Sequence, residues 1–191
     1  MGLSAQGAPG DSVVFVLAAT SRFEVRTGKA GLFGFLGHDH RIRARAVSGL
    51  IVYRPGAPTT SHVEIVVPAD SLEVLTPADT AEIRKVTEAM RTDVLQVASY
   101  PEIRFVSTAV TPMADSLGVQ GTLTLAGQTR DVSVAVAVTI NGDTLRGTGT
   151  FAVKQTDFGI KPYRGGPAGT VQVADRVTFE FEALGIAQVR P

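Results

Sequence analysis

The chain has 191 residues, 44% of them hydrophobic, and its 18 basic and 18 acidic residues cancel to a formal net charge of zero. This length suits one sizeable domain or two small ones, and the balanced charge gives no basic face of the kind that nucleic-acid binding uses. The chain has no cysteine, which excludes disulfides, thiol catalysis and cysteine-ligated metal sites.

The first residues are low in charge and contain neither the basic nor the apolar segment of a complete signal peptide. We expect residues 1–12 to form a flexible N-terminus ahead of a single domain over residues 13–185. Residues 3–6, LSAQ, resemble the end of a signal peptide. One hypothesis is therefore export, to the periplasm or beyond, with a cytoplasmic location as the alternative. No apolar run reaches the roughly 18 residues of a membrane span, so we expect a soluble protein.

Period-two alternation of apolar and polar residues dominates the chain and predicts β-strands. In one such run Val132, Val134, Val136 and Val138 share a face, and Asn141-Gly142 follows as a strong hairpin signal. The predicted strands are, in chain order, residues 13–27, 38–53, 62–75, 101–111, 117–126, 130–140, 144–154 and 173–184. Long consecutive antiparallel strands favour a closed up-and-down barrel, which leaves no exposed edge. A two-sheet sandwich is the structural competitor.

One segment, between the third and fourth predicted strands, has close to helical spacing. Its apolar positions are Ala81, Ile83, Val86, Met90, Val94 and Leu95. Residues 76–79, TPAD, supply a capping hydroxyl, a proline at the first helical position and an acidic residue. We therefore expect a helix of about three or four turns, with its apolar stripe packed near one end of the barrel.

Eight strands leave an interior that is either filled by side chains or holds one small ligand. Small residues on several strands predict room along the axis, although glycines also relieve bending in a curved sheet. They are Ala44, Ala46, Gly121, Gly147 and Gly149. A tunnel between such strands suits a long apolar chain, because each buried methylene contributes roughly 0.8 kcal/mol and a five-carbon unit about 3–4 kcal/mol before ordering costs.

The stretch GHDHRIRARA, residues 37–46, carries two of the three histidines and alternates strictly. One face holds His38, His40, Ile42, Ala44 and Ala46, and the other holds Arg41, Arg43 and Arg45. Because arginines belong in solvent, we expect the histidine face to point inward near a barrel mouth. Three roles are then open for the imidazoles. They hydrogen-bond backbone or carboxylate groups near the rim, they hydrogen-bond a quinone, phenol or amide head group of a ligand, or they bind a metal. Two histidines are too few for a typical zinc site, and His62 is the candidate third ligand.

Five segments resemble, in the same order along the chain, the YceI-like family of lipocalin-like, polyisoprenoid-binding proteins. They are SRFEVRTGKAGLFGFLGHDHRIRARAVSG, MRTDVLQVASYPEIRFVS, GVQGTLTLAGQTRDVSVAV, TFAVKQTDFGI and VQVADRVTFEFEAL. The resemblance covers about residues 13–184, and the GHDH tetrapeptide is similar to one branch of the family. It implies an eight-stranded antiparallel barrel with a lipophilic pocket that binds or transports isoprenoid-like or other long-chain lipids, commonly in the bacterial periplasm. It does not imply catalysis.

We therefore predict an all-β, eight-stranded, antiparallel up-and-down barrel with one helix inserted between its third and fourth strands. It is expected to bind and sequester or transport a long apolar lipid, isoprenoid or quinone-like, with the loops around 31–40 and 155–168 gating entry. The residues expected to face this ligand are Phe33, Phe35, Leu36, His38, His40, Ile42, Ala44, Met90, Phe105, Phe151, Phe158, Ile160 and Tyr163.

The chain lacks the G-x-S-x-G and H-E-x-x-H motifs and a phosphate-binding loop, so we expect no enzyme activity and no cofactor. The expected partner is the lipid, without nucleic acid, and the family resemblance is compatible with a homodimer. Two alternatives stay open. One is a metal-binding protein that uses His38, His40 and His62, and the other is a filled barrel that acts by binding another protein.

Overall fold

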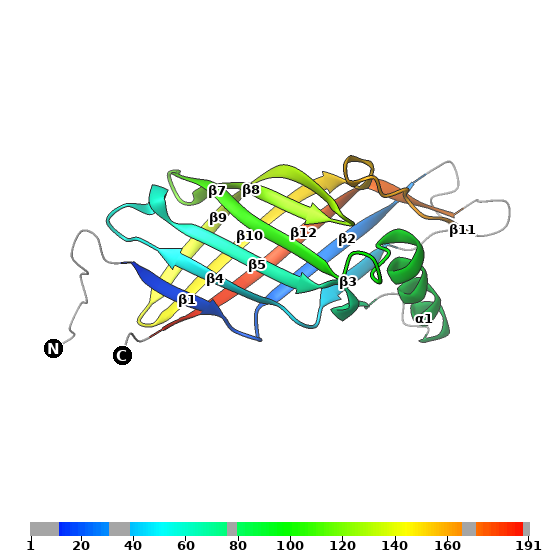
Figure 1. Ribbon diagram of the computed structural model, residues 1–191, viewed down its shortest axis with the longest axis horizontal. Helices are drawn as coiled ribbons and strands as arrows, with labels where there is room; N and C mark the ends of the chain where they lie inside the picture. The colour runs from blue at the N-terminus through cyan, green and yellow to red at the C-terminus, as the bar shows by residue number, and fades with distance from the viewer. Residues whose placement is uncertain (1–11, 31–38, 76–79, 166–170, 189–191) are drawn as a thin grey trace.

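Strands make up most of the regular structure in the computed structural model, which describes residues 12–30, 39–75, 80–165 and 171–188. They are β1 (Val13–Leu17), β2 (Arg22–Ala30), β3 (His40–Ala44), β4 (Ser48–Tyr53), β5 (His62–Pro68), β6 (Leu72–Val74), β7 (Glu102–Pro112), β8 (Leu117–Leu125), β9 (Gln128–Asn141), β10 (Thr144–Lys154), β11 (Arg164–Gly165) and β12 (Val171–Ala187). Helix α1 (Thr80–Ala89) continues as a π-helical turn over Met90–Val94. Figure 1 shows the strands arranged around a common axis, with α1 at one end.

The strands close into an eight-membered antiparallel ring. Its neighbours are β1, β4, β5, β7, β8, β9, β10 and β12, and β12 pairs again with β1. The remaining segments β2, β3 and β6 adjoin β1, β4 and β5 in the sequence. They extend the sheet beyond the ring, because β2 pairs with β12 and with β3, and β3 pairs with β6. The return of β12 to β1, with Val16 opposite Ile186, excludes a two-sheet sandwich and confirms the predicted barrel.

Three of the eight predicted strands are kinked rather than continuous. Residues 13–27 divide into β1 and β2, residues 38–53 into β3 and β4, and residues 62–75 into β5 and β6. At the first kink the Ser21 hydroxyl donates to the Leu184 carbonyl at 3.2 Å and accepts the Leu184 N–H at 3.0 Å. At the third, Pro68 has no N–H to continue the ladder, and the Ser71 hydroxyl donates to its carbonyl at 2.7 Å. Apolar residues occur on both sides of each kink, so the sequence alone predicted unbroken strands.

Tight hairpins join the long strands in the second half of the chain. Ala126 and Gly127, with φ of 47° and 74°, connect β8 to β9, and positive φ at both central residues matches the twist of the flanking strands. Asn141 lies opposite Thr144 across the β9–β10 turn, in which Gly142 has a φ of 60°. The hairpin predicted at Asn141-Gly142 is confirmed.

The predicted helix is also confirmed, and its packing depends on the turn that follows it. Met90 and Leu95 are buried, while Ile83 and Val86 pack half-buried against the same hydrophobic cluster. Arg91 holds this region to the sheet, since its Nη2 donates to the Asp70 carbonyl at 2.5 Å and the Leu72 carbonyl at 3.1 Å. The predicted start signal at residues 76–79 lies outside the described residues. In the described ranges, no helix has the length and apolarity needed to cross a membrane.

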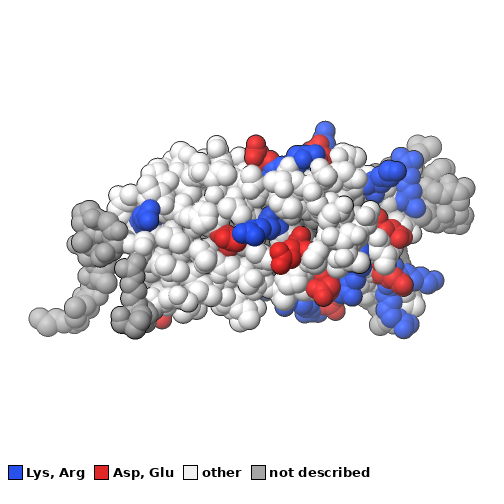
Figure 2. All heavy atoms as spheres, viewed as in Figure 1, with Lys and Arg blue, Asp and Glu red and all other residues white. Residues whose placement is uncertain are grey.

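The two ends of the barrel differ, and we name them the helix end, where α1 lies, and the hairpin end, where the β9–β10 turn lies (Figure 1). In the view of Figure 2, acidic and basic residues gather over the middle and the helix end, and few lie toward the hairpin end. Exposed apolar side chains adjoin one another on that side, because Val16 of β1 lies opposite Ile186 of β12 and Leu50 of β4. On the face seen in Figure 2, charged residues are therefore concentrated away from the hairpin end.

Candidate ligand-binding cavity

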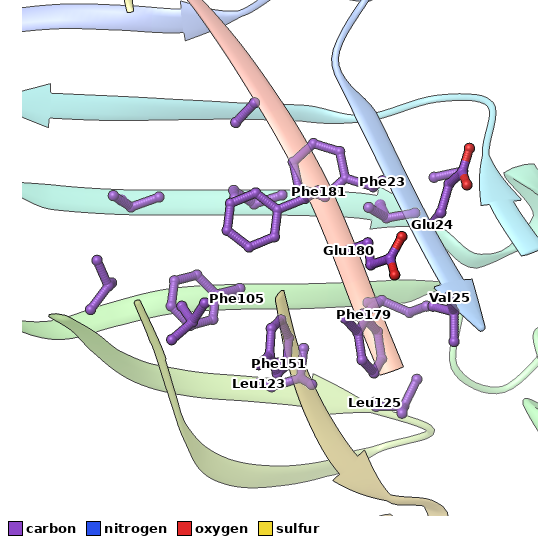
Figure 3. A pocket seen from close by; sticks show the side chains of 18 of the residues that line it. Phe23, Glu24, Val25, Phe105, Leu123, Leu125, Phe151, Phe179, Glu180 and Phe181 are labelled. Carbon is purple, nitrogen blue, oxygen red and sulfur yellow. The ribbon is translucent and has the colours of Figure 1, made fainter. Parts of the chain in front are cut away.

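An apolar cavity with a volume of about 240 Å³ lies inside the barrel. Met90, Val94 and Ile160 line it at the helix end, and Tyr53 and Val63 line it toward the hairpin end. Aliphatic and phenylalanine side chains from most of the strands form nearly the whole wall between these residues (Figure 3). The barrel therefore has a hollow interior rather than a filled core.

Five phenylalanines shape the wall, namely Phe23, Phe105, Phe151, Phe179 and Phe181. The Phe151 and Phe179 rings stack with centroids 4.9 Å apart and an interplanar angle of 9°. The Phe23 and Phe181 rings stack at 5.8 Å and 12°. Each pair joins directly opposed positions of neighbouring strands. Such cross-strand aromatic pairs stabilise the sheet and present apolar faces to the interior.

Strict alternation on β12 separates this wall from the outer surface. Phe179, Phe181 and Ala183 line the cavity. Between them Glu180 pairs with Arg26 at 2.8 Å, and Glu182 pairs with Arg146 at 3.0 Å. Because successive side chains of a strand point to opposite faces, one sequence pattern supplies both the apolar interior and the charged exterior.

The glycines predicted to leave room along the axis act in two different ways. A Cβ at Gly121 would lie 2.6 Å from Cζ of Phe105, and one at Gly149 would lie 2.7 Å from Cζ of Phe181. The rings therefore occupy the space that these two glycines leave. Only Gly147 among the three lines the cavity. The prediction was wrong for Gly121 and Gly149. Strand alternation shows which face a side chain lies on, but it does not show that a phenylalanine ring on the neighbouring strand covers the glycine.

Six of the residues predicted to face a ligand line the cavity. They are Ile42, Ala44, Met90, Phe105, Phe151 and Ile160. Ile42 and Ala44 point inward from β3, as the alternation of GHDHRIRARA predicted. Ala46 does not follow them and is exposed, because the chain kinks between β3 and β4 and the strand alternation stops there.

The other predicted site residues lie elsewhere. Phe158 is 1% exposed and belongs to the buried cluster beside the cavity, and Tyr163 is 43% exposed. His40 is half-buried at the start of β3, where its backbone N–H donates to Thr27 Oγ1 at 3.3 Å. The remaining four, Phe33, Phe35, Leu36 and His38, lie outside the described residues. So does most of the predicted gate at 31–40, together with residues 166–168 of the second gate.

The three-histidine metal site does not form. His40 lies at the helix end, opposite Thr27, while His62 begins β5 opposite Val52. Val52, the partner of His62, lies twelve residues beyond His40 along the β3–β4 run, which at about 3.3 Å per strand residue is roughly 40 Å of extended chain before the kink shortens it. The His62 Nδ1 instead lies 3.3 Å from the Ser107 hydroxyl, which accepts the Val63 N–H at the bulge in β7. Within the described ranges, no group of three potential metal ligands occurs.

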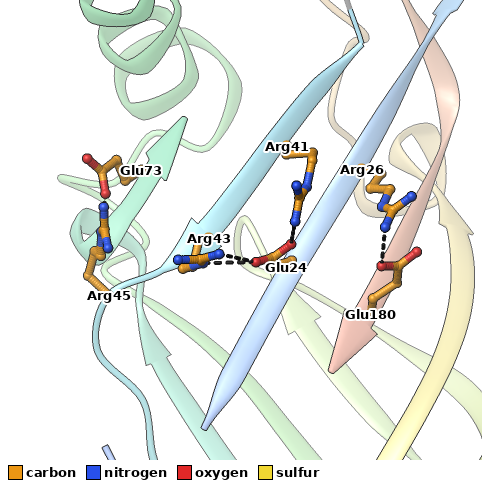
Figure 4. A network of polar contacts seen from close by, with 7 residues as sticks. All are labelled: Glu24, Arg26, Arg41, Arg43, Arg45, Glu73 and Glu180. Carbon is orange, nitrogen blue, oxygen red and sulfur yellow. Dashed lines mark hydrogen bonds and ion pairs between the residues drawn. The ribbon is translucent and has the colours of Figure 1, made fainter. Parts of the chain in front are cut away.

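A buried carboxylate underlies the arginine face of β3. Glu24 of β2 accepts hydrogen bonds from Arg41 Nη2 at 2.5 Å and from Arg43 Nη2 at 2.6 Å (Figure 4). Burial raises the pKa of the Glu24 carboxyl, but the hydrogen bonds and charges of the two guanidinium groups outweigh it and hold that pKa below its ordinary value. The arginines lie outside the barrel as predicted, yet they neutralise a specific acid rather than simply meeting solvent.

Sequence reasoning missed this acid and several wall residues. Phe23, Phe179 and Phe181 were detectable, because each keeps the parity of a predicted strand. Gln155 shares the inward parity of Phe151 and Val153, but it is a polar residue after the last position of β10, so the apolar pattern did not identify it. It nevertheless lines the cavity and is only 7% exposed.

Comparison with known proteins finds a matching domain family and similar sequences. Residues 16–184 match the model of the YceI-like domain family. A UPF0312 protein of Pseudomonas syringae pv. tomato is 41% identical over 98 residues, which are 46% of this chain and 48% of the relative. A UPF0312 protein of Pseudomonas savastanoi pv. phaseolicola is 40% identical over 101 residues, 48% and 49% of the two chains. The chain thus spans about half the length of the curated relatives it matches.

Several solved structures share the fold. BcnA of Burkholderia cenocepacia superposes with a TM-score of 0.69 at 20% identity, over 87% of this chain and 96% of the other. A polyisoprenoid binding domain from Saccharophagus degradans, implicated in plant cell wall breakdown, gives 0.65 at 14% identity, over 93% and 100%. A YCEI protein of Campylobacter jejuni gives 0.61 at 13% identity, over 78% and 85%. At these identities the likeness shows a common fold.

Proposed function

Because this chain belongs to the YceI-like domain family, we propose that it binds a long apolar lipid, isoprenoid or quinone-like, inside the barrel and sequesters or transports it. The observation that carries the proposal is the continuous apolar wall of the cavity, formed by inward residues of most strands and by Met90, Val94 and Leu95 beside the helix. The Saccharophagus degradans domain with the same fold is described as binding polyisoprenoid, which supports the same ligand class.

The energetics of the cavity favour an apolar chain. Each methylene moved from water into such a wall contributes roughly 0.8 kcal/mol, so an isoprene unit contributes about 3–4 kcal/mol. A few units then offset the translational and side-chain ordering costs of binding. The apolar tail therefore supplies the affinity, and the few polar groups of the wall are left to select the head group.

We propose a binding role without catalysis. In support, the polar residues other than acids that line the described wall are Thr27, Tyr53, Ser61 and Gln155. The carboxylates of the two acids at the wall, Glu24 and Glu180, are paired with arginines (Figure 4). General acid–base chemistry needs a titratable group within reach of the substrate, and arginines already occupy both of these carboxylates.

Extraction of the purified protein with organic solvent and mass spectrometry of the extract test the proposal. We expect a co-purified long-chain lipid, and uptake of N-phenyl-1-naphthylamine, an apolar fluorescent probe, by the delipidated protein. Ala44→Phe places a ring in the cavity and should reduce uptake. Ala137→Phe, on the exposed face of β9, is the matched control and should leave it unchanged. Recovery of no lipid together with no probe uptake would contradict the proposal.

A further inference from the structure

We propose that Gln155 selects the head group of the bound lipid, and that this head group is neutral and donates a hydrogen bond, as an alcohol, a phenol or an amide N–H does. The inference rests on the proposed lipid-binding function and names the chemical class of the ligand. It follows from the position of the Gln155 side chain, from the atom that its amide group leaves available, and from the surrounding wall.

Gln155 continues the inward face of β10 into the turn that follows. Phe151 and Val153 point inward from β10, and Gln155, two residues further, opens the 3-10 turn Gln155–Phe158. The turn is anchored to β12, because the Thr156 N–H and hydroxyl donate to the Asp175 carboxylate at 2.9 and 2.8 Å. Gln155 is thereby held in the cavity wall with 7% of its surface exposed.

A backbone carbonyl fixes the orientation of the Gln155 amide. The register of β12 shifts between Val173 and Val177, and the Ala174 carbonyl within this irregularity accepts a hydrogen bond from Gln155 Nε2 at 2.8 Å. A carbonyl oxygen can only accept, so the NH₂ group of the amide must face it. The Oε1 atom is consequently turned away from Ala174.

The Oε1 atom has no donor among the described residues. The only hydrogen bond of the Gln155 side chain in this part of the chain is the one from Nε2. Oε1 is not fully enclosed either, since Arg91 Nε is the only fully enclosed side-chain N or O atom without a partner in the described residues. A ligand in the cavity that Gln155 lines is therefore the proposed partner of Oε1.

The neighbouring wall restricts what can meet this oxygen. Ile160, Val177 and Met90 are apolar, and no lysine or arginine lines the described cavity. An anionic phosphate head would find no counter-charge there, and a buried charge without a partner is strongly disfavoured. An ether or a quinone carbonyl cannot pair with Oε1, because both atoms would be acceptors. A neutral O–H or N–H group is the head that pairs with Oε1.

A second polar group stands nearby on the adjoining strand. Thr27 of β2 lines the cavity and lies opposite Val177, which also pairs with Val153 of β10. The Thr27 hydroxyl oxygen already accepts the His40 N–H at 3.3 Å, so the hydroxyl proton is the part left to offer. One donor and one acceptor at the helix end fit a hydroxyl, which both gives and receives a hydrogen bond.

The test compares ligands that share one tail and differ only in the head. Geranylgeraniol, its methyl ether and geranylgeranyl phosphate displace a bound fluorescent probe from the delipidated wild-type protein. We expect the alcohol to bind roughly tenfold more tightly than the ether, the effect of one hydrogen bond, and the phosphate to bind more weakly than the alcohol. Equal affinities for alcohol and ether, or tightest binding of the phosphate, would overturn the assignment.

Variants locate the selectivity. Gln155→Leu and Gln155→Met should bring the alcohol-to-ether ratio close to one, while Gln120→Leu, which deletes an exposed amide on the outer face of β8, should keep the wild-type ratio. Retention of the ratio in both Gln155 variants, or its loss in Gln120→Leu alone, would contradict a role for Gln155. If either variant fails to fold, the wild-type comparison still decides. Failure of all three ligands to bind would instead overturn lipid binding itself.

Discussion

Glu24 is the only charged residue in the described part of the chain that is almost fully enclosed, with 5% of its surface exposed. Its two arginine partners lower its folded pKa below the ordinary value of 4.5. For a depressed carboxyl pKa, the stabilisation is present above the unfolded pKa and is lost as the pH falls through the folded pKa. The ion pairs of Glu24 therefore stabilise the barrel at neutral pH and stop doing so in acid.

The variant Glu24→Gln tests this linkage. We expect its free energy of unfolding at pH 7 to be lower by about 2 kcal/mol, since two charged hydrogen-bond donors lose their partner. The difference from wild type should shrink as the pH falls below 4.5. Urea titrations across the pH range measure both. Glu73, Asp175 and Glu182 also have lowered pKa values and are present in both proteins, so they cancel in the difference. A difference that is independent of pH would contradict the linkage.

Gly127 is required in the β8–β9 turn for two separate reasons. Its φ is 74°, and a Cβ there would lie 2.3 Å from Cε1 of Tyr100. We expect Gly127→Ala to lower the free energy of unfolding by about 2–3 kcal/mol, because backbone strain and steric overlap add. Gly142→Ala is the control, since φ is 60° there but no atom lies within 4 Å, and about 1 kcal/mol is expected. Equal losses in urea denaturation would show that Tyr100 plays no part.

Individual residues differ in how far the sequence could place them. Parity put Ile42 and Ala44 in the wall, because both lie within β3 where alternation holds. Phe158 was misplaced, because it lies in the turn after β10 where period two ends. Glu24 shares the parity of Arg22 and Arg26, so the pattern indicates an exposed acid. Its burial depends on arginines that β3 brings across the sheet, a tertiary contact that no local pattern contains.

At the scale of elements, the strand and helix assignments followed from periodicity, whereas the kinks did not. The kinks depend on side-chain bonds between distant segments, such as Ser21 with Leu184. Helix α1 also depends on a contact between distant segments, although the apolar spacing predicted that a helix forms there. Its attachment depends on Arg91, which bridges from the π-helical turn to the carbonyls of Asp70 and Leu72. The Arg91 side chain therefore adds hydrogen bonds to the apolar contacts that hold the helix at the edge of the sheet beside the cavity.

Loss of this attachment should loosen the helix without unfolding the barrel. We expect Arg91→Met to raise hydrogen exchange of the amides in residues 80–95 by roughly tenfold, because two hydrogen bonds to the sheet are lost. Exchange in β8 and β9 should stay unchanged. Arg84→Met, which alters an exposed arginine of α1, is the matched control and should exchange like wild type. Exchange mass spectrometry measures each segment, and equal protection in both variants would exclude the clamp.

At the scale of the whole molecule, the pairing of β12 with β1 closes the barrel and so determines whether the chain encloses a cavity. The end of β12 pairs with β1 through Phe15–Ala187, Val16–Ile186 and Leu17–Gly185. Gly185 permits a close approach here, since a Cβ on it would lie 2.8 Å from that of Phe15. Strand number and order favoured a closed barrel from the sequence. The size of the cavity depends on how the rings of the wall lean, and parity does not determine that.

A hollow barrel gains stability when its cavity is filled, because the ligand binds the folded state and not the unfolded chain. At a free lipid concentration of about 100 times Kd, the free energy of unfolding should rise by about 2.7 kcal/mol. For a domain of this size, that corresponds to an increase in Tm of about 5–10 °C. Thermal melts of delipidated protein with and without geranylgeraniol measure the increase. The gain should fall in Ala44→Phe, whose added ring competes for the cavity, and persist in Ala137→Phe, whose ring lies outside. An undiminished gain in Ala44→Phe would place the lipid elsewhere, because a ligand held on the outer surface is indifferent to a ring inside the barrel.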